Sequence, residues 1–219
     1  MDSADVRRRM VARLAAAGLG DAALLEALAN VPRHAFVDAA LAAQSYEDTS
    51  LPIGHGQTIS KPSVVARMIA LLLQGATART KGSLGRVLEV GTGCGYQAAL
   101  LARLSRHVVS VERLKPLHDR ARESLTALGI AHVRLVYGDG TLGHPPNAPY
   151  DSIIAAAGGE ALPPAWLAQL APGGRLVAPL HQPGRRHQVL VVVDRDENGY
   201  THSIHEAVHF VPLISGLTG

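Results

Sequence analysis

The sequence of 219 residues has a single cysteine, Cys94, which excludes an internal disulfide. A chain without disulfides suits a reducing compartment, so we expect it in the cytoplasm. The sequence has no uninterrupted apolar run of the ~18–20 residues that a membrane-spanning helix needs. Arg13 and Asp21 interrupt the apolar stretch in which a signal peptide would have its core. We therefore expect no membrane partner.

The chain also has few aromatic residues and only a small excess of positive charge. The formal net charge is +3 and aromatic residues make up 4% of the chain. The one basic run, Arg7 to Arg9, is better explained as a solvated helix face than as a binding patch. No basic surface with interleaved aromatic residues can be recognised, so we expect no nucleic-acid partner. The hydrophobic content of 47% is typical of a globular chain, long enough here for one α/β domain.

The N-terminal part, residues 4–45, is rich in alanine and predicted to be helical. Val6, Met10 and Leu14 recur at four-residue steps, as on one face of an amphipathic helix. Asp21 is expected to cap a second helix that runs through Leu28. These residues indicate a helical packing layer and carry no chemistry of their own.

A glycine turn follows the first strong strand signal. Residues 87–90 are apolar except for Glu89 and include two β-branched valines, which predicts a buried strand, and residues 97–104 have helical character. Between them lie Gly91, Gly93 and Gly95. Glycine permits positive φ and a close approach of ligand to backbone, and the helix start offers free N–H groups to an anionic group. The segment predicts a cradle for a nucleotide cofactor, although a tight turn without a ligand stays open on this motif alone.

The spacing of the glycines discriminates between cofactors. A dinucleotide fingerprint would require a glycine at the position of Tyr96. An acidic residue at the strand end, Glu89, followed by G-x-G-x-G instead resembles the first motif of the S-adenosylmethionine-dependent methyltransferases. A nicotinamide-dependent dehydrogenase is therefore a disfavoured alternative.

A second motif lies in residues 51–62, which are rich in proline, glycine and polar side chains and are predicted to form a loop before a helix over 64–73. The stretch from Gly54 to Pro62 reads G-H-G-Q-T-I-S-K-P. Together with the glycine turn it resembles the bacterial protein-L-isoaspartate O-methyltransferases, which carry G-x-G-Q-T-I-S-x-P. The resemblance extends from about Val31 to Leu213.

The rest of the chain alternates strands and helices. Strands are expected at residues 107–111, 133–137, 150–156 and 175–179, and two further runs, 188–193 and 200–211, flank a hairpin signal. Glu112 ends the second strand, where Rossmann-like folds place an acid on the ribose hydroxyls. The alternative is a surface glutamate that pairs with Arg113 or Lys115.

The expected fold class is α/β. By resemblance it is the Rossmann-like fold of the S-adenosylmethionine-dependent methyltransferases: a mostly parallel sheet with an antiparallel C-terminal hairpin and an N-terminal helical layer. We expect one domain over residues 1–219, with the helical layer at 1–50, an active-site loop at 51–62 and a cofactor-binding core at 63–219.

The resemblance also implies a reaction and the residues for it. The reaction is methyl transfer from S-adenosylmethionine to the free α-carboxylate of isoaspartyl residues, and also D-aspartyl residues, in damaged proteins and peptides, which starts repair through a succinimide. The implied catalytic residues are Ser60 and Thr58, and the implied substrate-binding residues are Gln57, Ile59, Val211 and Leu213. The implied cofactor-binding residues are Glu89, Gly91, Thr92, Gly93, Gly95, Glu112, Asp139 and Gly140. A monomer is expected.

Two other motifs are set aside. Residues 205–209 read H-E-x-x-H, a zinc-protease pattern, but that chemistry needs a helix and this stretch has strand composition. We expect no metal. Cys94 has no histidine near it in sequence, and Ser60 lacks a G-x-S-x-G elbow, so neither is expected to act as a covalent nucleophile.

One departure from the family pattern concerns the substrate groove. Residues 156–160 read Ala-Ala-Gly-Gly-Glu, with Gly158 and Gly159 after the two alanines where alanine-alanine-proline is commoner, so the conformation there is left open. Three further alternatives stay open: methylation of RNA, methylation of a small molecule, and a binding-only protein that keeps the cofactor pocket.

Overall fold

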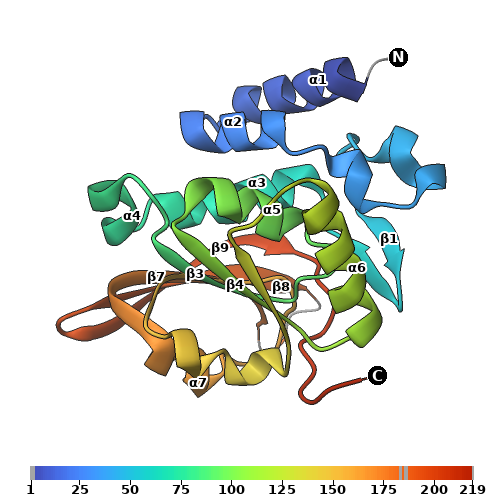
Figure 1. Ribbon diagram of the computed structural model, residues 1–219. Coiled ribbons are helices and arrows are strands. Elements are labelled where there is room, and N and C mark those ends of the chain that lie inside the picture. Colours follow the sequence, from blue (N-terminus) through green and yellow to red (C-terminus); the bar gives the residue numbers. More distant parts are fainter. Residues whose placement is uncertain (1–2, 183, 185–186, 219) are drawn as a thin grey trace.

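A mixed sheet organises the chain (Figure 1). The computed structural model describes every residue except 1–2, 183, 185–186 and 219. In the described residues, seven strands lie in the order β5-β4-β3-β6-β7-β8-β9. Their bounds are β3 (Arg86–Val90), β4 (His107–Glu112), β5 (Val133–Tyr137), β6 (Tyr150–Ala155), β7 (Leu170–His181), β8 (Gln188–Asp196) and β9 (Gly199–Val208). Strands β3 to β7 pair in parallel, while β8 and β9 are antiparallel.

Helices cover both faces of the sheet. They are α1 (Ser3–Ala16), α2 (Ala22–Asn30), α3 (Pro62–Leu73), α4 (Ala76–Lys81), α5 (Tyr96–Leu104), α6 (Lys115–Ala127) and α7 (Pro164–Gln169), with short 3₁₀ turns η1 (Arg33–Phe36), η2 (Ala39–Gln44), η3 (Gly140–Leu142) and η4 (Pro145–Asn147). Figure 1 shows α3 and α5 between the sheet and the outer pair α1 and α2, with α7 on the opposite face. Coverage on both faces explains why β3 and β6 are buried at nearly every position. The predicted fold class is confirmed.

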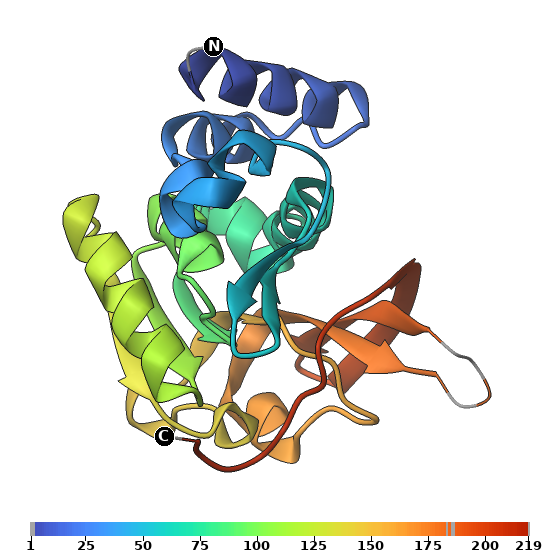
Figure 2. The same cartoon turned by 90° about the vertical axis from the view of Figure 1, so that its right-hand side faces the viewer.

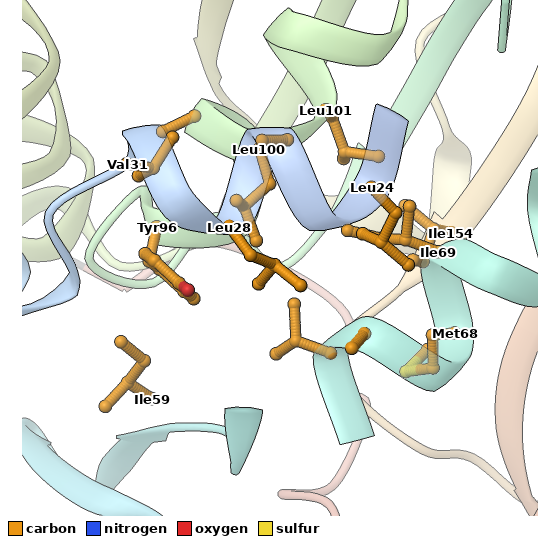
Figure 3. Close-up of a cluster of buried hydrophobic side chains, with 14 of the residues drawn as sticks. Leu24, Leu28, Val31, Ile59, Met68, Ile69, Tyr96, Leu100, Leu101 and Ile154 are labelled. Atoms are coloured by element: carbon orange, nitrogen blue, oxygen red, sulfur yellow. The ribbon is translucent and has the colours of Figure 1, made fainter. Parts of the chain in front are cut away.

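The larger hydrophobic core lies between the sheet and the N-terminal layer. Figure 3 shows Leu24 and Leu28 of α2 facing Leu100 and Leu101 of α5, with Met68 of α3 nearby. Asp21 accepts a hydrogen bond from the Leu24 N–H at 2.9 Å, so the predicted cap of the second helix is confirmed. The layer is thus fixed by continuous apolar packing onto the helices that flank the pocket described below.

The prediction of a loop over residues 51–62 was wrong. The segment forms an antiparallel hairpin of β1 (Leu51–Gly54) and β2 (Gln57–Ile59), and α3 begins directly at Pro62. Leu51 and Ile53 alternate inward, but the prolines and glycines of the segment hide this period-two pattern in the sequence. The turn has positive φ at Gly54, His55 and Gly56 (91°, 53° and 68°). The hairpin gives the motif a fixed backbone.

Some strand boundaries also differ from the prediction, and one short helix was missed. Strand β7 begins at Leu170, before the expected Arg175, with an irregular register against β6. Strand β9 ends at Val208 rather than at Val211. Helix α4 was not predicted because it is short and polar, so its apolar periodicity is weak. No helix in the described part of the chain is both long and apolar enough to cross a membrane.

The H-E-x-x-H stretch lies in a strand, as expected. His205 and Glu206 belong to β9, and His209 follows its end. Strand spacing separates residues four apart by roughly 13 Å, too far for two ligands of one zinc ion. Glu206 instead pairs with Arg67 of α3 at 2.6 Å. Among the described residues, no three histidine, cysteine, aspartate or glutamate side chains are grouped as a metal site requires.

We therefore expect purified protein to contain far less than one zinc per chain, measured by mass spectrometry of the metal. Chelation should leave its activity intact. One tightly bound zinc that is lost in His205→Ala would contradict both expectations.

Candidate active site

One pocket lies beyond the carboxyl ends of the parallel strands. Strand β3 stands between β4 and β6, so the chain order reverses at this point, where open α/β sheets bind their ligands. About 880 Å³ of space at this pocket is free of protein atoms, counted out to open solvent. Figure 2 shows the β1–β2 hairpin in front of the sheet and the C-terminal tail running past it towards α6.

The pocket collects most of the residues predicted from the sequence. Its lining includes Gln57, Thr58, Ile59, Ser60, Gly91, Thr92, Gly93, Glu112, Gly140, Val211 and Leu213. Glu89, Gly95 and Asp139 are outside this lining. The fold therefore unites the hairpin motif, the glycine turn, the end of β4 and the C-terminal tail around one cavity.

The glycine turn has a left-handed backbone that exposes its peptide groups. Gly93 has φ of 56°, and a Cβ there would meet Ile53 Cδ1 at 3.2 Å and nothing else within 4 Å. Because Ile53 and Gly93 both line the pocket, that Cβ would project into it. At Gly95, with φ of 92°, a Cβ would instead contact Ala121 of α6 at 3.3 Å. Gly93 thus keeps the pocket open, while Gly95 allows close helix packing.

The carboxylate of Glu112 holds this turn in place. Its Oε2 accepts a hydrogen bond from the Gly93 N–H at 2.8 Å, and its Oε1 accepts one from the Leu114 N–H at 2.9 Å. The side chain is only 5% exposed, so the alternative of a surface glutamate paired with Arg113 or Lys115 was wrong. Each carboxylate oxygen keeps a further lone pair for a ligand in the pocket.

Glu89 is fully buried and reaches the pocket wall only through other side chains. Ser110 donates a hydrogen bond to its Oε2, and the Ser110 hydroxyl is 2.5 Å from that of Thr92, which lines the pocket. Burial raises the pKa of Glu89 most, Ser110 and the Gln97 amide lower it and the Glu112 charge raises it, with a net pKa of about 8. Glu89 Oε1 and Gln97 Nε2 lie buried without a hydrogen bond of good geometry. Glu89 is therefore mainly protonated at neutral pH.

Asp139 faces the C-terminal tail. Its Oδ1 accepts hydrogen bonds from the Thr141 N–H and hydroxyl at 2.9 and 2.7 Å, and its Oδ2 accepts one from the Gly216 N–H at 2.6 Å. Burial alone would raise the pKa of Asp139, but these bonds and the Arg113 charge bring it below its ordinary value. The neighbouring Gly140 lines the pocket, and its carbonyl accepts a hydrogen bond from Trp166 Nε1 at 2.8 Å.

The tail and the double glycine form the wall that carries Val211 and Leu213. The Gly158 N–H donates to the Val211 carbonyl at 2.9 Å, and the Leu213 N–H donates to the Gly158 carbonyl at 2.8 Å. A Cβ at Gly158 would lie 2.4 Å from Gln188 Nε2, so a larger residue there would have to displace the Gln188 side chain. This pairing defines the conformation that the sequence left open.

Ionisable groups are few in this pocket. Its described lining contains no histidine or lysine, and burial raises the pKa of the lining Cys94 thiol. Glu112 has both oxygens engaged by backbone N–H groups. The pocket therefore suits a reaction in which the nucleophile arrives already ionised and only needs alignment.

Sequence reasoning missed several contributors. Ser110 could have been noticed as a polar residue within an apolar strand. Arg113 is part of the lining and also fixes the tail, because it donates from Nε to the Gly216 carbonyl at 3.0 Å and from Nη2 to the Thr218 hydroxyl at 2.6 Å. No local sequence signal indicates these tail contacts.

Known proteins are similar to this chain over nearly its whole length. A protein-L-isoaspartate O-methyltransferase from Methylibium petroleiphilum is 62% identical over 217 residues, covering 99% of this chain and 80% of that one. One from Leptothrix cholodnii is 63% identical, covering 99% and 76%.

Solved structures agree with these relatives. A structure of a protein-L-isoaspartate O-methyltransferase superposes with a TM-score of 0.85 at 27% identity, covering 96% of this chain and 67% of that one. A Plasmodium falciparum protein in complex with S-adenosyl-L-homocysteine superposes with a TM-score of 0.81. The two proteins are 23% identical, and the superposition covers 95% of this chain and 98% of the other, so it shows a shared fold.

The family described as protein-L-isoaspartate(D-aspartate) O-methyltransferase matches residues 5–218. This match covers almost the whole chain, includes both motifs that line the pocket, and accords with relatives above 60% identity. The chain belongs to the protein-L-isoaspartate(D-aspartate) O-methyltransferase family.

Proposed function

We propose that the protein methylates the free α-carboxylate of L-isoaspartyl residues, and also the side-chain carboxylate of D-aspartyl residues, in damaged proteins and peptides. One observation carries this proposal: the glycine cradle and the polar hairpin line the same pocket. A cofactor on one wall and a peptide carboxylate on the other would meet in a space that has few other charged groups.

The residues of the cradle fit S-adenosylmethionine. The space in front of Gly93, which a Cβ would fill, permits a ligand to approach the backbone. The free lone pairs of Glu112 suit two adjacent ribose hydroxyls, and Gly91, Thr92 and Gly140 complete that wall. Glu89 and Gly95 support it from behind, and Asp139 is assigned to the adenine amino group. Bound S-adenosylmethionine supplies the methyl group from its sulfonium.

The hairpin is assigned to the peptide. Ser60 and Thr58 line the pocket, and we assign the Ser60 hydroxyl to donate a hydrogen bond to the substrate carboxylate while Thr58 helps to orient it. Gln57, Ile59, Val211 and Leu213 would hold the flanking peptide. An α-carboxyl with an ordinary pKa below about 4 is ionised at neutral pH, so no general base is required. What the residues contribute is alignment and exclusion of water.

The product chemistry accounts for repair. An isoaspartyl residue continues the chain through its side-chain carbon and leaves its α-carboxylate free. Methylation converts this carboxylate into an ester, from which the following amide nitrogen displaces methanol and closes a succinimide. Hydrolysis of the succinimide returns some normal aspartate. The protein itself only has to distinguish the isoaspartyl carboxylate from an aspartyl side chain.

We further propose a monomer that works in the cytoplasm without nucleic acid or membrane. The single, buried Cys94 suits a reducing compartment. Light scattering coupled to gel filtration tests the oligomeric state, and a mass near 23.0 kDa is expected. A mass near twice that value would contradict the monomer.

The first test of the cradle is Gly93→Ala. The new Cβ should obstruct the cofactor, so binding of S-adenosylhomocysteine measured by calorimetry should weaken at least about ten-fold, that is by ~1.4 kcal/mol. The matched control is Gly129→Ala, because Gly129 also has a positive φ, 65°, but its Cβ would meet nothing within 4 Å. Equal binding by both variants would place the cofactor elsewhere. Nicotinamide dinucleotides should not bind the parent protein.

Glu112→Gln tests the ribose contact. The amide replaces one acceptor oxygen by a donor that faces a backbone N–H, so cofactor binding should weaken by about 1–3 kcal/mol. The affinity for an isoaspartyl peptide should change little. Glu123→Gln, at an exposed position of α6, is the control. A cofactor dissociation constant that is the same in both variants would remove Glu112 from the site.

Ser60→Ala tests the carboxylate contact. Loss of one hydrogen bond to a charged group costs ~1.5–3 kcal/mol, which corresponds to a roughly ten- to hundred-fold slower methyl transfer. Cofactor affinity should be preserved. A variant as fast as the parent would move the alignment role to Thr58 or the hairpin backbone. Complete inactivity with a trappable methyl-serine in the parent would indicate covalent catalysis instead.

The experiment that tests the function compares an isoaspartyl peptide with its normal aspartyl twin. With labelled cofactor, base-labile methyl ester should form on the isoaspartyl peptide alone. Equal labelling of both peptides would leave a methyltransferase of another specificity. No labelling of either, with cofactor still bound, would favour a small-molecule or RNA substrate or a binding-only protein.

A further inference from the structure

Arg33 carries a positive charge in the interior beneath the hairpin. It belongs to η1 of the N-terminal layer and is 0% exposed. Its Nε donates to the Ser45 carbonyl at 2.7 Å and its Nη2 donates to the Ser60 carbonyl at 2.7 Å. Its guanidinium carbon lies 4.9 Å from the centroid of the Tyr96 ring. The guanidinium is outside the pocket, but both Ser60 and Tyr96 line it.

Few interactions compensate for the burial of this charge. No ion pair joins Arg33 to a carboxylate in the described part of the chain, and its Nη1 and the Tyr96 hydroxyl both lie buried without a hydrogen bond of good geometry. Burial lowers the pKa of Arg33, although Tyr96, Cys94 and the more distant Asp48 act in the opposite direction. Burying an incompletely paired charge lowers the stability of the fold, whereas an apolar side chain at the same place would not. The placement therefore indicates a role other than stabilising the fold.

The backbone around Ser60 is restrained on both sides. Arg33 holds the Ser60 carbonyl, and Asp48 accepts hydrogen bonds from the Ser63 N–H at 2.9 Å and the Ser63 hydroxyl at 2.8 Å. Pro62 lies between these two contacts at the first position of α3. With the carbonyl of Ser60 directed at Arg33, the direction of its side chain into the pocket is limited.

Arg33 also connects the two walls of the pocket. Tyr96 is the first residue of α5, directly after the glycine turn, and its ring packs on Phe36 at 5.6 Å as well as on Arg33. One guanidinium therefore contacts the start of the helix behind the cofactor wall and the end of the hairpin on the peptide wall. A displacement of about 1 Å between reacting groups can cost about a hundred-fold in rate.

We propose that Arg33 is a positioning residue for methyl transfer, which fixes the Ser60 backbone relative to the glycine turn so that the Ser60 hydroxyl meets the substrate carboxylate. This rests on the proposed function of Ser60. Arg33 acts through Ser60 and contacts neither substrate nor cofactor. Through Arg33, the N-terminal layer, which carries no chemistry of its own, helps to position the reacting groups.

The test combines Arg33→Met with Ser60→Ala. Arg33→Met keeps much of the side-chain length but has no donors, so we expect kcat/KM for an isoaspartyl peptide to fall at least ten-fold while S-adenosylhomocysteine binding stays within about two-fold. In the Ser60→Ala background, Arg33→Met should lower kcat/KM by less than about three-fold, because the hydroxyl that Arg33 positions is already gone. A double variant whose loss in kcat/KM equals the product of the two single-variant losses would contradict the proposal.

Arg175→Met is the matched control. Arg175 is also largely buried and donates to a backbone carbonyl, that of Leu71 at 2.9 Å, besides its ion pair with Asp194 at 2.7 Å. Its substitution should lower the melting temperature but leave kcat/KM within about two-fold. If both arginine variants lose activity in proportion to their stability, Arg33 is merely structural.

Two further measurements keep the proposal testable. If Arg33→Met does not fold, Arg33→Lys takes its place in the test. The lysine side chain is shorter and its single ammonium cannot bond both carbonyls, those of Ser45 and Ser60. The same coupling to Ser60→Ala is expected. Amide hydrogen exchange over residues 55–63 needs no substrate and should accelerate about ten-fold in the Arg33 variants but not in Arg175→Met. Unchanged exchange overturns the proposal. Parent protein that is inactive on isoaspartyl peptides rejects the proposed function instead, and the exchange result still decides the role of Arg33.

Discussion

The carboxylate of Glu112 is the contact on which the cofactor wall depends. It joins the glycine turn after β3 to the start of α6 after β4, through one hydrogen bond to Gly93 and one to Leu114. The two segments are neighbours because β3 and β4 pair in parallel. A buried carboxylate with two backbone donors forms strong, charge-assisted bonds. The same group therefore shapes the left-handed turn and offers lone pairs to a ligand, so structure and recognition share one side chain.

The other wall depends on parts of the chain that are far away in sequence. The segment after the hairpin is held by Arg33 of the N-terminal layer at Ser60 and by Asp48 at Ser63, while the tail is held by Gly158, Asp139 and Arg113. These segments carry irregular backbone whose polar groups need partners when they are not hydrated. Side chains and neighbouring backbone supply those partners here. The pocket is thus built between a rigid sheet edge and two segments fixed by a small number of hydrogen bonds.

Much of the fold could be predicted from the sequence because its strands are apolar, β-branched and bounded by glycine or proline. Periodicity located β3, β4, β5 and β8 closely, and the spacing of the glycines with Tyr96 and Glu89 indicated the cofactor class. The hairpin was mistaken for a loop, since Pro52 and the three left-handed residues at its tip mask the alternation of Leu51 and Ile53. The predictions that rested on a local pattern of apolar, polar and glycine residues were therefore the reliable ones.

Contacts between distant segments could not be predicted in this way. Nothing near Asp139 in the sequence indicates that Gly216 donates to it, and nothing near Arg33 indicates that it holds the Ser60 carbonyl. Glu112 was placed correctly at a strand end, but its burial and its bond to Gly93 depend on strand pairing. Such contacts decide the shape of the pocket, and only the assembled sheet brings their partners together.

The most direct measurement is a crystal structure of the protein with S-adenosylhomocysteine and an isoaspartyl peptide bound together. The account predicts the ribose hydroxyls on the Glu112 carboxylate, and the isoaspartyl α-carboxylate on the Ser60 hydroxyl across the same pocket. A cofactor bound away from Gly93, or a carboxylate held by groups other than those of the hairpin, would contradict it.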